Sequence, residues 1–118
     1  MDNLAEKIVK LLDDKKAEDI KILNIEELTS IADCFVIASG GSNVQVKALC
    51  DHVEEELRKK NIFPKHTEGY RNASWILLDY GSVIVHIFNR ETREFYKIEN
   101  LWTDPGQKPQ NDTDSDIE

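Results

Sequence analysis

The sequence predicts an α/β fold in which a small mixed β-sheet is flanked by helices. Apolar residues recur at helical spacing in three segments, and short apolar runs typical of strands lie in four others. Their order is helix, strand, strand, helix, strand, strand, helix, which is typical of helices packed on one sheet. The chain has 118 residues and no visible internal repeat, so we expect a single domain over residues 1–102.

The first part of this domain is predicted to be a helix followed by two strands. Residues 3–16 place their apolar positions on one helix face. Residues 20–25 and 35–39 are apolar runs of strand length, and Gly40-Gly41 ends the second run. The apolar face of the first helix consists of Leu4, Ile8, Leu11 and Leu12.

A second helix is predicted to begin at Ser42. Gln45 follows three residues later, which is the spacing of a capping box. Asn61 is a suitable residue for the end of this helix, because asparagine tolerates the left-handed backbone found there. The inward stripe of the helix consists of Val46, Leu49, Cys50, Val53 and Leu57.

The last part of the domain is predicted to be a loop, a hairpin and a helix. Residues 62–74 have the composition of a loop, whereas residues 75–80 and 83–88 are strong strand signals joined by Gly81-Ser82. A change of period after this hairpin favours a helix that begins near Asn89 or Glu91. An edge strand over residues 94–98 is the alternative. The periodic residues of this segment are Phe95, Ile98, Leu101 and Trp102.

The charge of the chain limits the partners it suits. Fifteen Lys and Arg residues stand against 23 Asp and Glu residues, so the net charge is −8. Nucleic acids and anionic membranes reward a basic surface, so a basic protein is the better partner. Residues 103–118 hold five of the acids and one apolar residue, Ile117, and we expect a disordered acidic tail there. The chain has no secretory signal and too few cysteines for a disulfide framework, so we expect a cytoplasmic protein.

The turn Gly40-Gly41-Ser42 is the first candidate for chemistry. A turn between a strand and a helix can bind an anion with free backbone N–H groups. The phosphate-binding fingerprints are absent, however, so a tight turn with a capping serine is the favoured interpretation. A two-metal nucleotidyltransferase site would need paired carboxylates on a following strand, and Asp79 stands alone on its strand.

The other candidate residues are cysteines, histidines and the apolar hairpin. Cys34 and Cys50 lack basic neighbours and are expected to be inert, and no histidine lies at zinc-ligand spacing. His86 lies on a strand whose faces are both mostly apolar, and a buried histidine is favoured there over a catalytic base. The hairpin side chains from Trp75 to Tyr80 either form an exposed interface patch or belong to a strand covered on both faces.

Three long motifs carry a resemblance to a known family. They are SIADCFVIASGGSNVQ at residues 30–45, WILLDYGSVIVHIF at residues 75–88 and REFYKIENLW at residues 93–102. In this order they resemble the signatures of the ribosomal silencing factor family, also called RsfS or Iojap. The resemblance covers about residues 1–104. Cys34, Gly41 and Ser82 depart from the residues common in the family.

The resemblance implies a nucleotidyltransferase-like fold without catalytic carboxylates, no catalysis and no cofactor. It implies binding to large-subunit ribosomal protein fourteen, a steric block to joining of the ribosomal subunits and repression of translation. Members of the family also tend to form dimers. The contact residues carried over from the family are Trp75, Ile76, Leu78, Asp79 and Tyr80, with His86 nearby.

Two other interpretations remain open from the sequence. One is a minimal nucleotide-binding or nucleotidyltransferase-like enzyme that uses Gly40, Gly41, Ser42 and Asp79. The other is a dimeric scaffold whose hairpin patch binds only a second copy of the chain.

Overall fold

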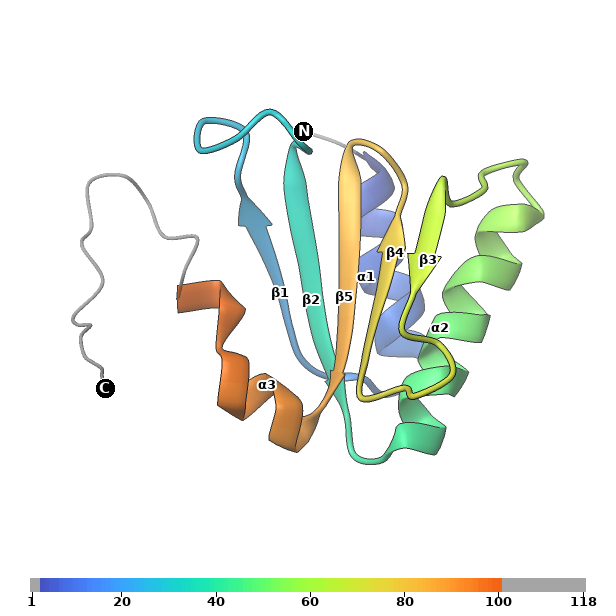
Figure 1. Ribbon diagram of the computed structural model, residues 1–118. Coiled ribbons are helices and arrows are strands. Elements are labelled where there is room, and N and C mark those ends of the chain that lie inside the picture. The colour runs from blue at the N-terminus through green and yellow to red at the C-terminus, as the bar shows by residue number, and fades with distance from the viewer. Residues whose placement is uncertain (1–2, 101–118) are drawn as a thin grey trace.

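The computed structural model describes residues 3–100, which form a five-stranded sheet with helices on both faces (Figure 1). Strands β2 (Cys34–Gly40) and β5 (Val83–Asn89) are parallel and all other neighbours are antiparallel, so the predicted α/β fold with a mixed sheet is confirmed. The predicted tail over residues 103–118 lies outside the described residues. In sheet order the strands are β1 (Glu18–Asn24), β2 (Cys34–Gly40), β5 (Val83–Asn89), β4 (Trp75–Asp79) and β3 (His66–Glu68).

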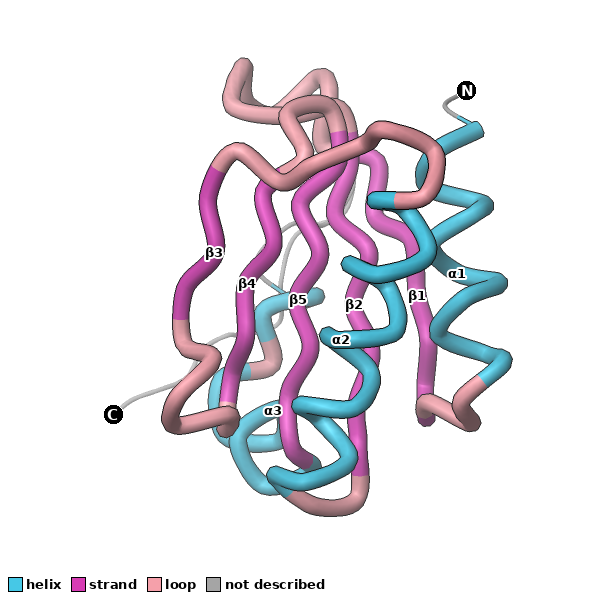
Figure 2. The backbone as a smooth tube through the Cα atoms, turned by 90° about the vertical axis from the view of Figure 1, so that its right-hand side faces the viewer, coloured by secondary structure: helices cyan, strands magenta, loops and turns pink. Residues whose placement is uncertain are grey.

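Two of the helices, α1 (Asn3–Asp14) and α2 (Asn43–Arg58), lie on the same face of the sheet, as Figures 1 and 2 both show. All five residues of the predicted α2 stripe are buried, and they pack with inward residues of α1 and of the strands in one apolar core. The third helix, α3 (Arg90–Tyr96), and the short 3-10 helix η1 (Ile98–Asn100) lie on the other face. Within residues 3–100, no helix is both long and apolar enough to cross a membrane.

The ends of α2 follow the local signals of the sequence. Ser42 Oγ accepts a hydrogen bond from the Gln45 N–H at 3.1 Å, which caps the first turn. At the other end, Asn61 has a left-handed backbone with φ 62°. The Ile62 N–H then donates to the Leu57 carbonyl at 2.9 Å, the bond that closes a Schellman motif.

The loop predicted over residues 62–74 is wrong in one part, because it contains β3. This strand has three residues, all exposed, and pairs with one edge of β4. A short polar segment with no buried face has no alternation of apolar residues to reveal it. Only its partner strand defines it.

The helix predicted after the hairpin is confirmed, and the edge strand over residues 94–98 is wrong. Asn89 caps α3 by accepting a hydrogen bond from the Thr92 N–H, and Lys97 ends the helix in a left-handed conformation. The periodic pattern predicts this helix but does not predict which of its residues are buried. Ile98 is buried, but Phe95 is 80 % exposed, and Leu101 and Trp102 lie outside the described residues.

Candidate docking surface

The two faces of β4 divide the predicted contact residues. Ile76, Leu78 and Tyr80 point into the core beneath α1 and α2, where the first two are fully buried and Tyr80 is 8 % exposed. Alternate residues of a strand point to opposite faces, so Trp75 and Asp79 lie on the other side of the sheet, where both are half-buried. Ile76, Leu78 and Tyr80 are therefore too deeply buried to contact a partner directly. The sequence is apolar at these positions because they belong to the core.

The face of the sheet opposite α1 and α2 is the candidate docking surface, and β4 contributes Trp75, Leu77 and Asp79 to it. In an antiparallel pair, residues directly opposite each other share a face. The register therefore adds His66, which pairs with Asp79, and Glu68, which pairs with Leu77. Asp79 also holds the hairpin turn, because its Oδ1 accepts a hydrogen bond from the Gly81 N–H at 2.8 Å.

Behind this surface, His86 holds the Trp75 indole. The Trp75 Nε1–H donates to His86 Nδ1 at 3.1 Å, and the Phe88 ring centroid lies 4.8 Å from that of Trp75. His86 is 5 % exposed, and burial lowers its pKa to about 4. The interpretation of His86 as a buried, hydrogen-bonded histidine is confirmed. Its imidazole supports the surface from below.

The aromatic surface continues onto α3. The Tyr96 ring centroid lies 5.0 Å from that of Trp75, and the Phe95 ring meets Tyr96 edge-on at the same centroid distance. Tyr96 is 50 % exposed. We call Trp75, Phe95 and Tyr96 the aromatic ridge. The periodicity of the sequence assigns Phe95 to a helical stripe and therefore does not predict this ridge. The signal for the ridge is the pair of adjacent aromatic residues in an otherwise polar helix.

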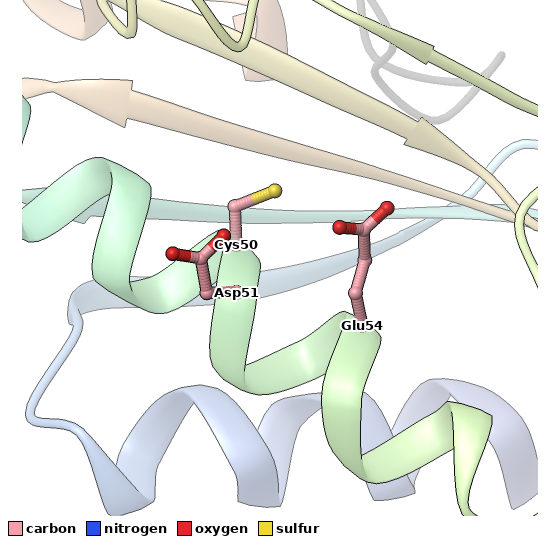
Figure 3. A group of neighbouring side chains, drawn as sticks. All are labelled: Cys50, Asp51 and Glu54. Atoms are coloured by element: carbon pink, nitrogen blue, oxygen red, sulfur yellow. The ribbon is translucent and has the colours of Figure 1, made fainter.

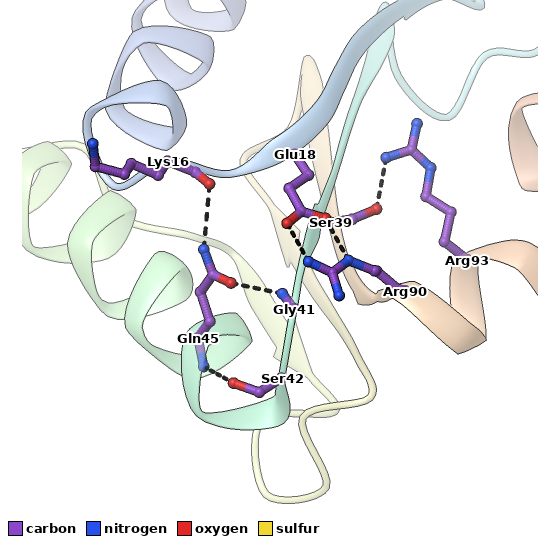
Figure 4. Close-up of polar contacts among 8 residues, drawn as sticks. All are labelled: Lys16, Glu18, Ser39, Gly41, Ser42, Gln45, Arg90 and Arg93. Carbon is purple, nitrogen blue, oxygen red and sulfur yellow. Dashed lines mark hydrogen bonds and ion pairs between the residues drawn. The ribbon is translucent and has the colours of Figure 1, made fainter.

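The Gly40-Gly41-Ser42 turn is occupied by the chain itself (Figure 4). The Gly41 N–H donates to Gln45 Oε1 at 2.6 Å, and Gln45 Nε2 donates to the Lys16 carbonyl at 3.3 Å. With Ser42 as the helix cap, the favoured interpretation as a tight turn with a capping serine is confirmed.

The residues of the enzyme hypothesis do not meet in space. Gly40 pairs with Asn89 at the end of β5, whereas Asp79 pairs with Ile84 near its beginning. Asp79 and the Gly40 turn therefore lie at opposite ends of the sheet, and the hypothesis of a site that combines them is wrong. The sequence alone does not show this separation, which results from the antiparallel pairing of β4 with β5.

A polar crevice of about 450 Å³ lies beside the turn, at the carboxyl ends of β2 and β5. Arg90 makes a two-pronged ion pair with Glu18, with N–O distances of 2.7 and 2.6 Å, and this pair lowers the pKa of Glu18. Arg93 is buried and donates to Ser39 Oγ at 2.8 Å, which ties α3 to β2 (Figure 4). Both arginines of the crevice thus bind to the protein's own strands.

One side-chain group on α2 has atoms close enough to share a metal ion. The ligand atoms of Cys50, Asp51 and Glu54 lie within 4.8 Å of one another (Figure 3). Burial and the neighbouring carboxylates raise the pKa of the Cys50 thiol to about 12, and Asp51 already accepts a hydrogen bond from the Tyr70 hydroxyl. A protonated thiol is a poor ligand. Cys50 packs in the core, as the sequence predicts for an inert cysteine.

All 118 residues match the family model described as "Ribosomal silencing factor during starvation". The chain belongs to the ribosomal silencing factor family. It is similar to the ribosomal silencing factor RsfS of Halalkalibacterium halodurans, with 41 % identity over 81 % of this chain and 82 % of that protein. It is also 31 % identical to a mouse protein named "Mitochondrial assembly of ribosomal large subunit protein 1", over 81 % of this chain and 43 % of that protein.

A solved structure supports the same assignment. The crystal structure of a protein from Chromobacterium violaceum has 34 % identity and a TM-score of 0.83, covering 97 % of this chain and 95 % of that one.

Two of the silencing-factor motifs coincide with the central strands of this fold and the turns that follow or join them. Residues 30–45 form β2, the Gly40 turn and the start of α2, and residues 75–88 form the hairpin of β4 with most of β5. These two segments contain the parallel pairing at the centre of the sheet. Much of the resemblance therefore comes from residues of the core, and within β4 the half-buried residues Trp75, Leu77 and Asp79 are the part of it that reaches the surface.

Proposed function

We propose that this protein binds the large ribosomal subunit through ribosomal protein fourteen and silences translation by blocking subunit joining, chiefly when nutrients are scarce. The match of the whole chain to the silencing-factor family is the observation that carries the proposal. The action is steric and takes place in the cytoplasm, without catalysis or a cofactor. A single sheet that, within residues 3–100, has only the short α3 and η1 over one face suits it.

The docking surface in this proposal is the aromatic ridge with Asp79. Aromatic side chains bury a large area at a low cost in rotamer entropy, which makes them good anchors for an interface. The carboxylate of Asp79 offers an ion pair to a basic partner. Ile76, Leu78 and Tyr80 contribute indirectly, because their burial fixes the strand that presents Trp75.

Loss of the indole is the sharpest test of this surface. We expect Trp75→Ala to weaken co-sedimentation with large subunits by about 2 kcal/mol or more, the usual cost of losing an interface anchor. Pull-down of isolated ribosomal protein fourteen and a subunit-joining assay should show the same loss. A matched control is Ile22→Ala, because Ile22 is an exposed apolar residue whose partner Val36 lies on the helix-covered face of the sheet.

The result that contradicts the proposed surface is unchanged co-sedimentation of Trp75→Ala with its thermal unfolding also unchanged. If the unmodified protein fails to bind either the large subunit or ribosomal protein fourteen, the proposed function itself is wrong.

A dimer is the second candidate, because an aromatic ridge with 80 % of Phe95 exposed also suits a second copy of the chain. A dimer through the ridge would compete with docking on the ribosome. Light scattering across a dilution series should then show a dimer that dissociates when ribosomal protein fourteen is added. Dimers that persist with that protein bound would place self-association on another surface.

A further inference from the structure

A small basic hollow lies between the start of α2 and the loop that leads into β4. Its volume is about 260 Å³, and its lining contains two cations, Lys47 and Arg71, and no carboxylate. The remaining lining residues are Asn43, Val44, Asn72 and Ala73. The chain has a net charge of −8, but the charged residues among those that line this hollow are all cations.

The walls of this hollow are held by hydrogen bonds. Asn43 Nδ2 donates to the Asn72 carbonyl at 3.3 Å, which joins α2 to the loop that precedes β4. Asn43 Oδ1 accepts from Asn89 Nδ2 at 2.8 Å, which joins α2 to the end of β5. Three segments far apart in the sequence therefore build a fixed frame for the two cations.

The two cations are available for a ligand. Within residues 3–100, neither Lys47 nor Arg71 has a carboxylate within ion-pair distance. The Lys47 ammonium lies 5.2 Å from the centroid of the Tyr70 ring, whose hydroxyl donates to Asp51. This contact restrains the lysine side chain and leaves its charge in place. The end of a helix alone would not make a site, and the evidence for one here is the pair of cations that share a hollow.

We propose that this hollow binds a backbone phosphate of ribosomal RNA while the protein is docked on the large subunit, an inference that rests on the proposed function. A guanidinium and an ammonium that line one hollow match the charge of a single phosphate group. Residues 71–73 of the hollow lie just before Trp75. Asn89, the cap of α3, also donates to Asn43 of the hollow at 2.8 Å, so the hollow lies at the end of the sheet where the helix of the ridge begins. A partner that covers the ridge and extends around this end of the sheet reaches the hollow.

Because the rest of the chain is acidic, we expect the contact with RNA to be confined to this hollow. Most of the surface repels RNA, so ribosomal protein fourteen supplies the main docking energy and the phosphate adds a second, salt-sensitive contact. An acidic segment of a ribosomal protein would be the other source of a negative group. RNA is favoured because phosphates are the most abundant anions on a ribosomal surface.

The test compares the full chain with the variant Lys47→Ala/Arg71→Ala. A matched control is Lys7→Ala/Lys10→Ala, which removes the same charge from exposed positions of α1. We expect the first variant to bind large subunits about tenfold more weakly at low salt, as for the loss of a charge-assisted contact. The logarithmic salt dependence of its affinity should fall by about 1, the value for one phosphate contact. Its affinity for isolated ribosomal protein fourteen should be unchanged.

Direct titrations identify the ligand, and they do not depend on ribosome binding. The side-chain NMR signals of Lys47 and Arg71 should shift with a short duplex RNA, and more weakly with inorganic phosphate. Shifts with a polyglutamate peptide and none with RNA would overturn the proposal in favour of an acidic protein. Equal losses in both variants would show a bulk charge effect and also overturn it. If ribosome binding fails altogether but the RNA titration succeeds, only the proposed function is wrong.

Discussion

Among single residues, the hydrogen bond between Trp75 and His86 fixes the position of the indole in the docking surface. Because Nδ1 accepts the indole N–H, the neutral imidazole carries its proton on Nε2, which has no hydrogen-bond partner among the described residues. The Phe35 ring lies edge-on at a centroid distance of 4.5 Å. An unpaired buried donor costs stability. In this chain the imidazole therefore costs stability at Nε2 and fixes the position of the indole through Nδ1.

The burial of His86 predicts a pH dependence of stability. Its pKa is lowered from 6.5 to about 4, so the folded state keeps the neutral ring where the unfolded chain already binds a proton. Stability from this group is complete above about pH 6.5 and falls as the pH drops toward 4, by up to about 3 kcal/mol. Chemical denaturation at a series of pH values measures this loss.

The control for the pH experiment is His86→Asn, which keeps an acceptor near the Nδ1 position and removes the titration. We expect the loss of stability between pH 6.5 and 4 to be smaller in this variant by the same amount. Identical pH profiles for the two proteins would show that His86 does not titrate in this range.

Tyr80 is the second residue whose position predicts the result of a substitution. Its hydroxyl is buried without a hydrogen-bond partner among the described residues, and burial raises its pKa. Tyr80→Phe should therefore leave the free energy of unfolding unchanged or slightly higher, because an unpaired polar atom is removed. Tyr80→Ala should cost about 3–5 kcal/mol, because it opens a cavity in the core. Equal destabilisation by both variants would contradict this assignment.

The loop between β3 and β4 fixes the beginning of β4 at the scale of elements. Gly69 has φ 83°, and a Cβ there would lie 2.1 Å from the Trp75 carbonyl oxygen. The Ala73 N–H donates to the Gly69 carbonyl at 2.8 Å, which closes the loop just before Trp75. A glycine is needed because both the backbone conformation and the close approach exclude a side chain.

This loop gives a paired prediction for two glycines. Gly69→Ala should destabilise the protein by about 1–3 kcal/mol or more, through strain and a clash with backbone. Gly41→Ala is the control, because its Cβ would meet only the far ends of two side chains, Arg90 at 3.1 Å and Gln45 at 3.4 Å, and no backbone. Thermal unfolding compares the two variants. A Gly69→Ala protein as stable as Gly41→Ala would show that the loop can change its path.

The elements that the sequence predicted well are those with local signals. The stripe and caps of α2 depend on residues within one helix, and the hairpin depends on its own turn. β3 could not be predicted, because its partner strand alone defines it. The candidate site was limited in the same way. Both faces of residues 75–80 are largely apolar, so alternation alone could not show that Ile76 and Leu78 face the helices.

At the scale of the whole molecule, the asymmetry of the two sheet faces separates folding from docking. Helices α1 and α2 cover one face and complete the main core there. The other face has only the short α3 and η1 among the described helices, and its smaller cluster borders the half-buried Trp75 and Leu77. Substitutions that weaken docking are therefore available on one face without loss of the main core.

The charge of the molecule predicts an effect on association rates. The acids at positions 112, 114 and 116 lie in the sequence beyond the docking fold, and their replacement by asparagine changes the net charge from −8 to −5. Long-range attraction acts on the rate of encounter with a basic partner, whereas close contacts set the rate of dissociation. We expect the triple variant to associate a few-fold more slowly with ribosomal protein fourteen at low salt, with dissociation and thermal unfolding unchanged. Stopped-flow kinetics at two salt concentrations provides the measurement, since screening should remove the difference at high salt. A change confined to the dissociation rate would instead place these acids in the interface.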